Sequence, residues 1–226
     1  MKNKLMKNKL MKLKVALLLC LSSSLSYSQI IINADIANAG GDYSVVTLKS
    51  GALAPTTAVV DFFWFSSGDF STISSWKSAS DWTSSSLYSN KLGSLTMGDG
   101  YSSLGPADGL FSGPVSPGAV PDSAVGKFLA AAITSGSELG VFRGTQLVPS
   151  NTPAPSPATP VAYSLADVNS AGVMVGSFSI LPNVTVLGDV PLTNIEGYGL
   201  IPEPSSASLL ALGVAGLVAL RVRRKS

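Results

Sequence analysis

Short apolar runs bounded by turn residues recur through residues 29–200, and this pattern constrains the fold more than any other feature. None of them places apolar residues at spacings of three and four over more than ten positions, so we expect little helix in this part. Frequent interruption by glycine, proline and aspartate is typical of sandwiches and barrels built from short strands. The pattern predicts a mostly β fold, a single β-sandwich or jelly-roll-like domain. Five of the runs are YSVVTL, KFLAAAIT, LGVFRG, GVMVGSFSIL and NVTVLGDV.

The run AVVDFFWF, at residues 58–65, is apolar at successive positions rather than at alternate ones. A strand with one face in water alternates apolar and polar side chains, whereas a strand covered on both faces does not. We therefore expect this segment to be a strand that is buried on both faces.

Five prolines fall within VPSNTPAPSPATP, residues 148–160. They predict an extended loop, because proline fixes φ and lacks a backbone donor. The loop is also a candidate domain boundary, but the forty residues that follow, 161–200, are too few to hold a core without disulfides or a metal. We expect them to pair with the earlier sheet, so that residues 29–200 form one domain.

The first 28 residues have the layout of a secretory signal peptide. Six lysines precede an apolar run at residues 15–21, and small polar residues follow. Met11 is an alternative start that changes nothing downstream. Ser26 and Ser28 put small side chains three residues and one residue before a cleavage site, so we place signal peptidase cleavage between Ser28 and Gln29. A buried N-terminal helix, the alternative, would leave the lysines without a role.

The chain contains one cysteine and no histidine. Cys20 follows Leu19, where a lipoprotein signal has a small residue, so we expect Cys20 to leave with the signal peptide. A mature chain without cysteine or histidine excludes disulfides, Ser-His-Asp and Cys-His catalysis and the common zinc sites. We expect no cofactor.

Residues 205–220 form an apolar segment interrupted only by small residues, and four cations follow it. As a helix it would span about 24 Å against a hydrocarbon core of about 30 Å, which predicts a short transmembrane helix. Cations next to a span stay on the cytoplasmic side, which places residues 29–200 across the membrane. A core helix is the alternative, but charged residues are rarely buried. The cations are Arg221, Arg223, Arg224 and Lys225.

Pro202, Glu203 and Pro204 stand directly before this apolar segment. A Pro-Glu-Pro motif, a small-residue spacer, a short apolar helix and an Arg-rich end, in this order, resemble the PEP-CTERM sorting signal. The resemblance covers residues 201–226. It implies that exosortase, an integral-membrane cysteine protease, recognises residues 202–204 and cleaves the chain, and that the cations of residues 221–225 act as a retention signal. The family's hosts are typically Gram-negative bacteria that make exopolysaccharide and biofilm.

Charge is distributed unevenly along the chain. Six of the fifteen cations lie in residues 1–28 and four in residues 221–225, so five remain in the body with twelve of the thirteen acids, a net charge of −7. An acidic exported domain has no electrostatic basis for binding nucleic acid.

Carboxylates remain as candidate catalytic or metal-binding groups. Paired carboxylates support glycoside hydrolysis, but no motif selects a pair, so a glycoside hydrolase is a remote alternative. Asp167, Asn169 and Gly172 in DVNSAG resemble the start of a calcium loop, yet no acid closes it, and turn chemistry accounts for the same residues. We therefore predict no catalytic residue and no metal ligand.

Trp76 and Trp82 lie in the Ser-rich stretch SSWKSASDWTSSSLYSN, residues 74–90. Exposed aromatic rings on a β-sandwich stack on sugar faces, which would make the domain a carbohydrate-binding module for matrix polysaccharide. Packing in the core or at its rim is the alternative, and it is the more frequent fate of a large ring.

These observations predict an exported, non-catalytic surface or extracellular-matrix protein that is associated with exopolysaccharide or biofilm. Its expected partners are the Sec translocon, signal peptidase, exosortase and exopolysaccharide. We expect the C-terminal helix to hold the chain in the membrane transiently, or in a retained single-span form.

Overall fold

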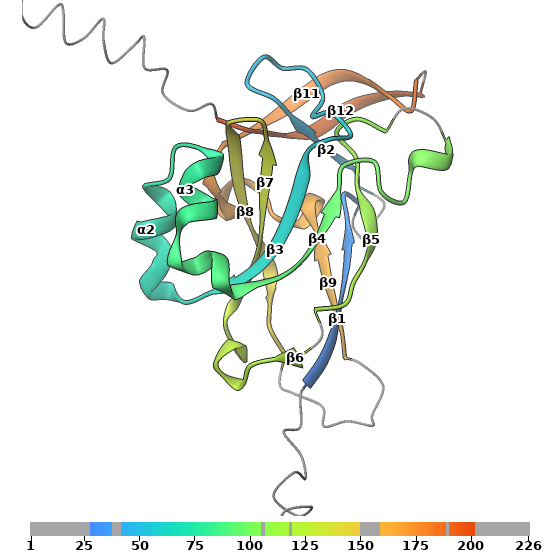
Figure 1. Cartoon of the computed structure of the whole chain (residues 1–226). Coiled ribbons are helices and arrows are strands. Elements are labelled where there is room, and N and C mark those ends of the chain that lie inside the picture. Colours follow the sequence, from blue (N-terminus) through green and yellow to red (C-terminus); the bar gives the residue numbers. More distant parts are fainter. Residues whose placement is uncertain are drawn as a thin grey trace, which may run out of the picture.

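The computed structural model describes residues 28–37, 42–104, 107–117, 119–149, 159–188 and 190–201. Within these ranges the chain forms twelve strands, two short α-helices and six 3-10 helical turns, and the strands make three sheets (Figure 1). The prediction of a mostly β fold is confirmed.

The largest sheet has five strands in the order β10-β8-β7-β3-β4, and all neighbours are antiparallel. Its central strands are apolar at nearly every position, a pattern that predicts burial on both faces. The strands are β10 (Val173–Val175), β8 (Glu138–Leu147), β7 (Phe128–Ser135), β3 (Val59–Phe65) and β4 (Lys91–Thr96).

β3 divides its side chains between two core clusters on opposite faces of the five-stranded sheet. Val60 and Phe62 belong to the larger cluster, and Phe63 and Phe65 belong to the smaller one. All four are completely buried. The prediction of a strand buried on both faces is confirmed for Val59–Phe65, because both faces of this sheet are covered, and Ala58 precedes the strand.

The second sheet is built around β1 (Ser28–Asp35). β5 (Ser112–Val115) and β6 (Ala119–Val120) pair with β1 in antiparallel orientation, and β9 (Thr159–Ser164) pairs with it in parallel. Alternate β1 side chains are aliphatic and face the larger core cluster, as expected for a strand with one covered face. These side chains are Ile30, Ile32 and Ala34.

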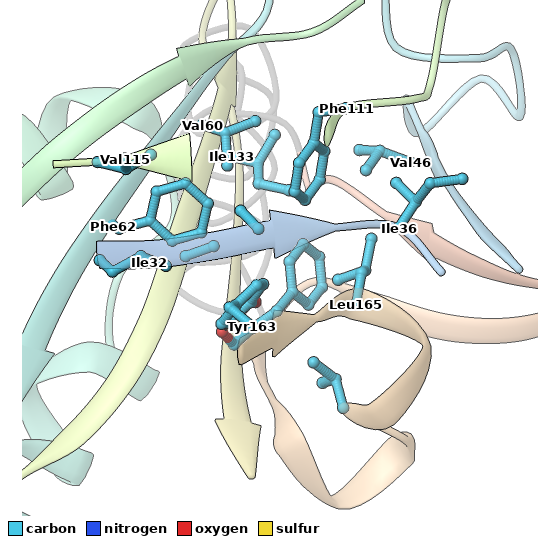
Figure 2. Close-up of a cluster of buried hydrophobic side chains, with 14 of the residues drawn as sticks. Ile32, Ile36, Val46, Val60, Phe62, Phe111, Val115, Ile133, Tyr163 and Leu165 are labelled. Atoms are coloured by element: carbon cyan, nitrogen blue, oxygen red, sulfur yellow. Dashed lines mark hydrogen bonds between the residues drawn. The ribbon is translucent and has the colours of Figure 1, made fainter. Parts of the chain in front are cut away.

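The larger core cluster lies between these two sheets (Figure 2). The Phe62 ring meets the Tyr163 ring edge-on at 5.2 Å between centroids, and the Phe111 ring at 6.4 Å. The Tyr163 hydroxyl donates to the backbone oxygen of Phe142 at 2.8 Å, so this buried phenol has an acceptor. We call this side of the five-stranded sheet the sheet-packed face.

The opposite side, which we call the helix-covered face, lies under α2 (Phe70–Ser74) and α3 (Ala79–Ser84) (Figure 1). The smaller core cluster fills this interface, with side chains from both helices and from β3, β7 and β8. Covering the second face explains why the central strands are apolar at successive positions.

The third sheet consists of the hairpin β11 (Ser177–Val186) and β12 (Val190–Gly199), with β2 (Ser44–Thr47) parallel to the end of β12. In Figure 1 it crosses one end of the molecule, and β1 begins at the other end. β9, β10 and β12 thus pair with the earlier strands β1, β8 and β2, as the short length of residues 161–200 led us to expect.

The proline-rich loop is described only near its ends, because residues 150–158 lie outside the described ranges. Val148 is buried, and its N–H donates to the Lys127 oxygen at 2.9 Å. The expected boundary at residue 160 is wrong by two residues, because Thr159 and Pro160 already belong to β9. Proline is tolerated near the start of a strand that borders a sheet.

The predicted signal peptide and transmembrane helix cannot be placed in this fold, because residues 1–27 and 202–226 lie outside the described ranges. Among the described residues, no helix has both the length and the apolar character needed to cross a bilayer.

Candidate functional site

Trp76 and Trp82 pack on the helix-covered face of the five-stranded sheet, and both rings are buried. Trp76 is 5% exposed and Trp82 is 0% exposed. The Trp82 ring lies 4.6 Å from the Phe63 ring and 5.6 Å from the Trp76 ring, between centroids. The hypothesis that these tryptophans stack on sugars is therefore wrong for this fold, and the core-packing alternative is observed.

The Ser-rich sequence places Trp82 by capping the short helix that carries it. Asp81 accepts hydrogen bonds from the backbone N–H groups of Lys77, at 2.6 Å, and Ser78, at 3.0 Å. Ser78 and Asp81 form a capping box at the start of α3, which satisfies donors that a helix leaves free. Trp82 comes one residue later, on the side of α3 that faces β3.

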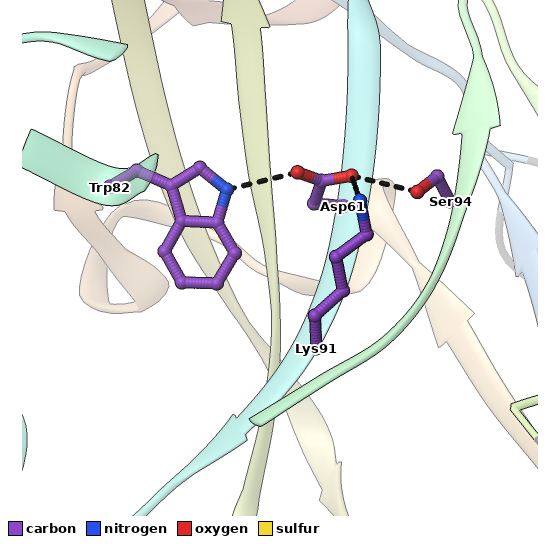
Figure 3. Close-up of polar contacts among 4 residues, drawn as sticks. All are labelled: Asp61, Trp82, Lys91 and Ser94. Carbon is purple, nitrogen blue, oxygen red and sulfur yellow. Dashed lines mark hydrogen bonds and ion pairs between the residues drawn. The ribbon is translucent and has the colours of Figure 1, made fainter. Parts of the chain in front are cut away.

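Asp61 is the charged group at the centre of this interface (Figure 3). It projects from β3 and accepts from Trp82 Nε1 at 2.9 Å and from Ser94 Oγ at 2.8 Å. Lys91 Nζ lies 2.8 Å from the same carboxylate. Because one donor from α3 and two donors from β4 converge on it, this carboxylate links α3 to the sheet.

Lys91 is the more exposed partner in the ion pair with Asp61. Burial lowers the pKa of Lys91, but the hydrogen bonds and charges of Asp61 and Tyr88 together outweigh burial, and the pKa is raised above its ordinary value. The Lys91 ammonium also lies 5.3 Å from the centre of the Tyr88 ring. A charged lysine held against a carboxylate and a ring suits a structural anchor.

A second carboxylate, Asp35, accepts several hydrogen bonds at the end of β1. Asp35 accepts from the Tyr101 hydroxyl at 2.9 Å, from Ser112 Oγ at 3.1 Å and from the backbone N–H of Ala37 at 3.1 Å. Burial, followed by the hydrogen bond to Asp35, raises the pKa of Tyr101, so this phenol stays a donor at neutral pH. The sequence gives no sign of this pairing, because 66 positions separate Asp35 from Tyr101.

Ser164 lies beside Asp35 in the neighbouring strand β9. Its hydroxyl oxygen is buried and has no hydrogen-bond partner among the described residues. A buried hydroxyl without a partner lowers stability. A Ser-His pair cannot form here, because the chain has no histidine.

The DVNSAG segment shows the expected turn chemistry. Asn169 has a positive φ of 51° and its side chain accepts from the Ala171 N–H at 2.9 Å, at the start of a 3-10 turn. Asn169 N–H donates to the Tyr198 hydroxyl at 3.1 Å. Within the described ranges, no three acidic side chains gather closely enough to hold a metal ion.

The last described residues of the chain lie next to β8. The Leu200 N–H donates to the Thr47 oxygen at 2.8 Å, and Ile201 exchanges two backbone hydrogen bonds with Leu139, each of 2.9 Å. Pro202, Glu203 and Pro204 follow directly and lie outside the described residues, as do the cations of residues 221–225. Ser28 and Gln29, the predicted signal cleavage pair, are the first residues of β1.

Comparison with known proteins gives a match for the C-terminal residues. Residues 200–225 match the family model of the PEP-CTERM protein-sorting motif, which confirms the resemblance seen in the sequence. Neither the curated proteins nor the solved structures contain a match to the chain. The match implies processing by exosortase and supports export to the cell surface. The matched segment begins at Leu200, and Leu200 and Ile201 are also the last described residues of the mostly β body.

Proposed function

We propose that this chain is an exported, non-catalytic surface or extracellular-matrix protein that exosortase sorts and cleaves. The observation that carries the proposal is the PEP-CTERM match over residues 200–225. A Pro-Glu-Pro segment suits a protease substrate, because its two prolines disfavour helix and sheet pairing. The signal peptide, signal peptidase and the Sec translocon would bring the body across the membrane, and the cations of residues 221–225 would stay inside.

The body acts as a stable β-sandwich scaffold in this proposal. Two observations favour a structural role over a catalytic one. The chain has no histidine. The two best-defined buried or half-buried carboxylates, Asp61 and Asp35, each accept from three donors that hold strands, helices or loops together.

Association with exopolysaccharide or biofilm follows from the family resemblance. The body's net charge of −7 favours a neutral or cationic glycan over a strongly anionic one, because like charges repel at low ionic strength. A carbohydrate-binding module based on Trp76 and Trp82 has no support, since both rings are buried.

Intact-mass measurement of the protein from the surface, matrix and membrane fractions of its native host tests the proposal. We expect a species that begins at Gln29 and ends near residues 202–204, in the surface or matrix fraction. A dominant species in the membrane fraction that still carries Arg221 to Lys225 would contradict it, because the tail would then be a permanent anchor.

A variant pair assigns the processing to the motif. P202A/E203A/P204A removes the Pro-Glu-Pro segment, and we expect the unprocessed chain to accumulate in the membrane fraction. S205A/S206A is the matched control, since it changes small residues beside the motif and should be processed as the wild type is.

Matrix association needs a separate measurement. The processed protein, purified from the surface fraction, should co-sediment with purified exopolysaccharide of the host at physiological salt. Recovery of all the protein in the supernatant, with and without added salt, would limit the proposal to surface display.

A further inference from the structure

The last described residues of the body are held by backbone hydrogen bonds to two different sheets. Leu200 N–H donates to Thr47 of β2 at 2.8 Å. Ile201 N–H donates to Leu139 of β8, and Leu139 N–H donates back to Ile201, both at 2.9 Å. We call this pair of attachments, Leu200 to Thr47 and Ile201 to Leu139, the C-terminal bridge.

Side-chain packing reinforces the C-terminal bridge. Leu200 is 2% exposed. It lies against the bare backbone of Gly140, where an added Cβ would come within 2.7 Å of Leu200 Cδ2. Ile201 packs against the smaller core cluster, to which Leu139 belongs. The absence of a side chain at Gly140 thus makes the room that Leu200 occupies.

The sorting motif and the folded body overlap at these residues. The family match begins at residue 200, so Leu200 and Ile201 belong both to the matched segment and to the C-terminal bridge. The three motif residues reach at most about 11 Å when fully extended. A protease needs its substrate segment free of the folded structure, which is why cleavage concentrates in loose termini and loop tips.

We propose that the C-terminal bridge controls access of the processing protease to residues 202–204. While the bridge is closed, Leu200 and Ile201 stay paired with β2 and β8, so the chain directly before Pro202 is held against the body. Opening the bridge frees two further residues and lets the motif move away from the body. If opening and closing are fast compared with cleavage, the processing rate follows the open population. This inference rests on the proposed processing by exosortase and adds no chemical step to it.

The arrangement has a consequence for the timing of processing. The bridge closes only when β2, β8 and β12 have assembled, since Thr47 and Leu139 belong to strands that come much earlier in the chain. A chain whose body has not folded therefore exposes its motif more than a folded chain does. The folded body slows its own release and keeps the protein longer at the membrane.

A disulfide across the bridge tests the proposal in the full-length chain in its host. In an antiparallel pair that exchanges both hydrogen bonds the Cα atoms lie about 5.5 Å apart, within the range that a disulfide spans. Leu139→Cys with Ile201→Cys should form this bond after export, because Cys20 lies in the predicted signal peptide. We expect processing in a pulse-chase to slow by about tenfold or more, since the locked chain cannot open. Dithiothreitol should reverse the slowing, and each single-cysteine variant should be processed at least as fast as the wild type.

A spacer variant tests the same idea without touching Leu139, which is buried. Insertion of Gly-Ser-Gly-Ser between Ile201 and Pro202 gives the motif free chain while the bridge stays closed. We expect this variant to be processed faster than the wild type. Wild-type rates in both the oxidised double-cysteine variant and the spacer variant would overturn the bridge as a control point.

The proposed function fails separately. If P202A/E203A/P204A is processed at the wild-type rate, the Pro-Glu-Pro segment is not what the protease reads, whatever the bridge variants do. If that variant accumulates unprocessed and the bridge variants behave as the wild type does, exosortase sorting stands and only the control by the bridge is wrong.

Discussion

The two faces of the five-stranded sheet are covered in different ways. On the sheet-packed face, Phe62 meets Phe111 and Tyr163, and the contacts are apolar apart from the Tyr163 hydroxyl, which has an acceptor. On the helix-covered face, Phe63 packs on Trp82, and a buried carboxylate, Asp61, stands beside them. Neighbouring residues of one strand thus serve two kinds of core.

The difference shows what a short helix needs in order to cover a sheet. α2 has five residues and α3 has six, far below the length at which an isolated helix is stable in water. Strands of the second sheet are held by their ladders, whereas these helices depend on caps and on side chains that reach the sheet. The Trp82 indole N–H donating to Asp61 supplies such a contact, at 2.9 Å.

The largest effect should come from emptying the sheet-packed face. Phe62→Ala removes a completely buried ring and leaves a cavity, which should lower the free energy of unfolding by about 3–5 kcal/mol. Urea titration of the processed protein, followed by tryptophan fluorescence, measures this. Leu104→Ala, at a site that is 65% exposed, is the control and should change stability by less than about 0.5 kcal/mol. A loss below about 1 kcal/mol for Phe62→Ala would contradict the role of this core.

The next largest effect should come from removing the charged anchor of the helix-covered face. Asp61→Ala leaves the Trp82 N–H and the Ser94 hydroxyl without their acceptor and should lower the free energy of unfolding by about 2–3 kcal/mol. A double-mutant cycle with Trp82→Phe separates the pair from its surroundings. The double variant should lose less stability than the two single losses added together, and strict additivity would show that the two groups are not coupled.

A smaller effect should follow from loosening α3 at its first turn. Asp81→Ala removes the acceptor of the Lys77 and Ser78 N–H groups and should lower the free energy of unfolding by about 1 kcal/mol. Hydrogen exchange should accelerate in residues 79–84 and stay unchanged in β9. Thr83→Ala, at an exposed site of the same helix, serves as control. Equal acceleration in both elements would mean that the two faces open together.

The smallest effect concerns the pH dependence of the Lys91 contact. Because the pKa of Lys91 is raised above 10.5 in the folded chain, its contribution is fully present below pH 10.5 and is lost as the pH rises through the folded pKa. Lys91→Met should therefore cost up to about 1 kcal/mol at neutral pH. The difference in free energy of unfolding between the wild type and Lys91→Met should become smaller in strongly alkaline solution. Tyrosine ionisation affects both proteins alike and cancels in this difference. A difference that stays constant with pH would therefore count against the Lys91 contact.

The β-rich class and the double burial of β3 could be predicted because both leave a local pattern. Residues 58–65 are apolar at successive positions, and the frequent turn residues limit element length. The sorting motif at residues 202–204 was recognisable for the same reason, since its parts follow one another in the chain.

The helix-covered face could not be predicted. α2 and α3 are too short to show a helical period, and serine is abundant in loops as well as in caps. For this reason the Ser-rich stretch gave no sign of the helices that bury Trp76 and Trp82, although core packing is the more frequent fate of a large ring. β1 was also missed as a strand, although its alternation of Ile30, Ile32 and Ala34 is visible in retrospect.

The sequence by itself determined the fold class, the central strand and the address carried by residues 202–204, because each depends on residues that are neighbours in the chain. Only the tertiary structure decided which side chains meet. Asp61 and Trp82 are 21 positions apart, and Leu139 and Ile201 are 62 positions apart, so no local pattern links them. Strand order sets such pairs, and it is decided by which packing buries the most apolar surface while leaving most buried polar groups a partner.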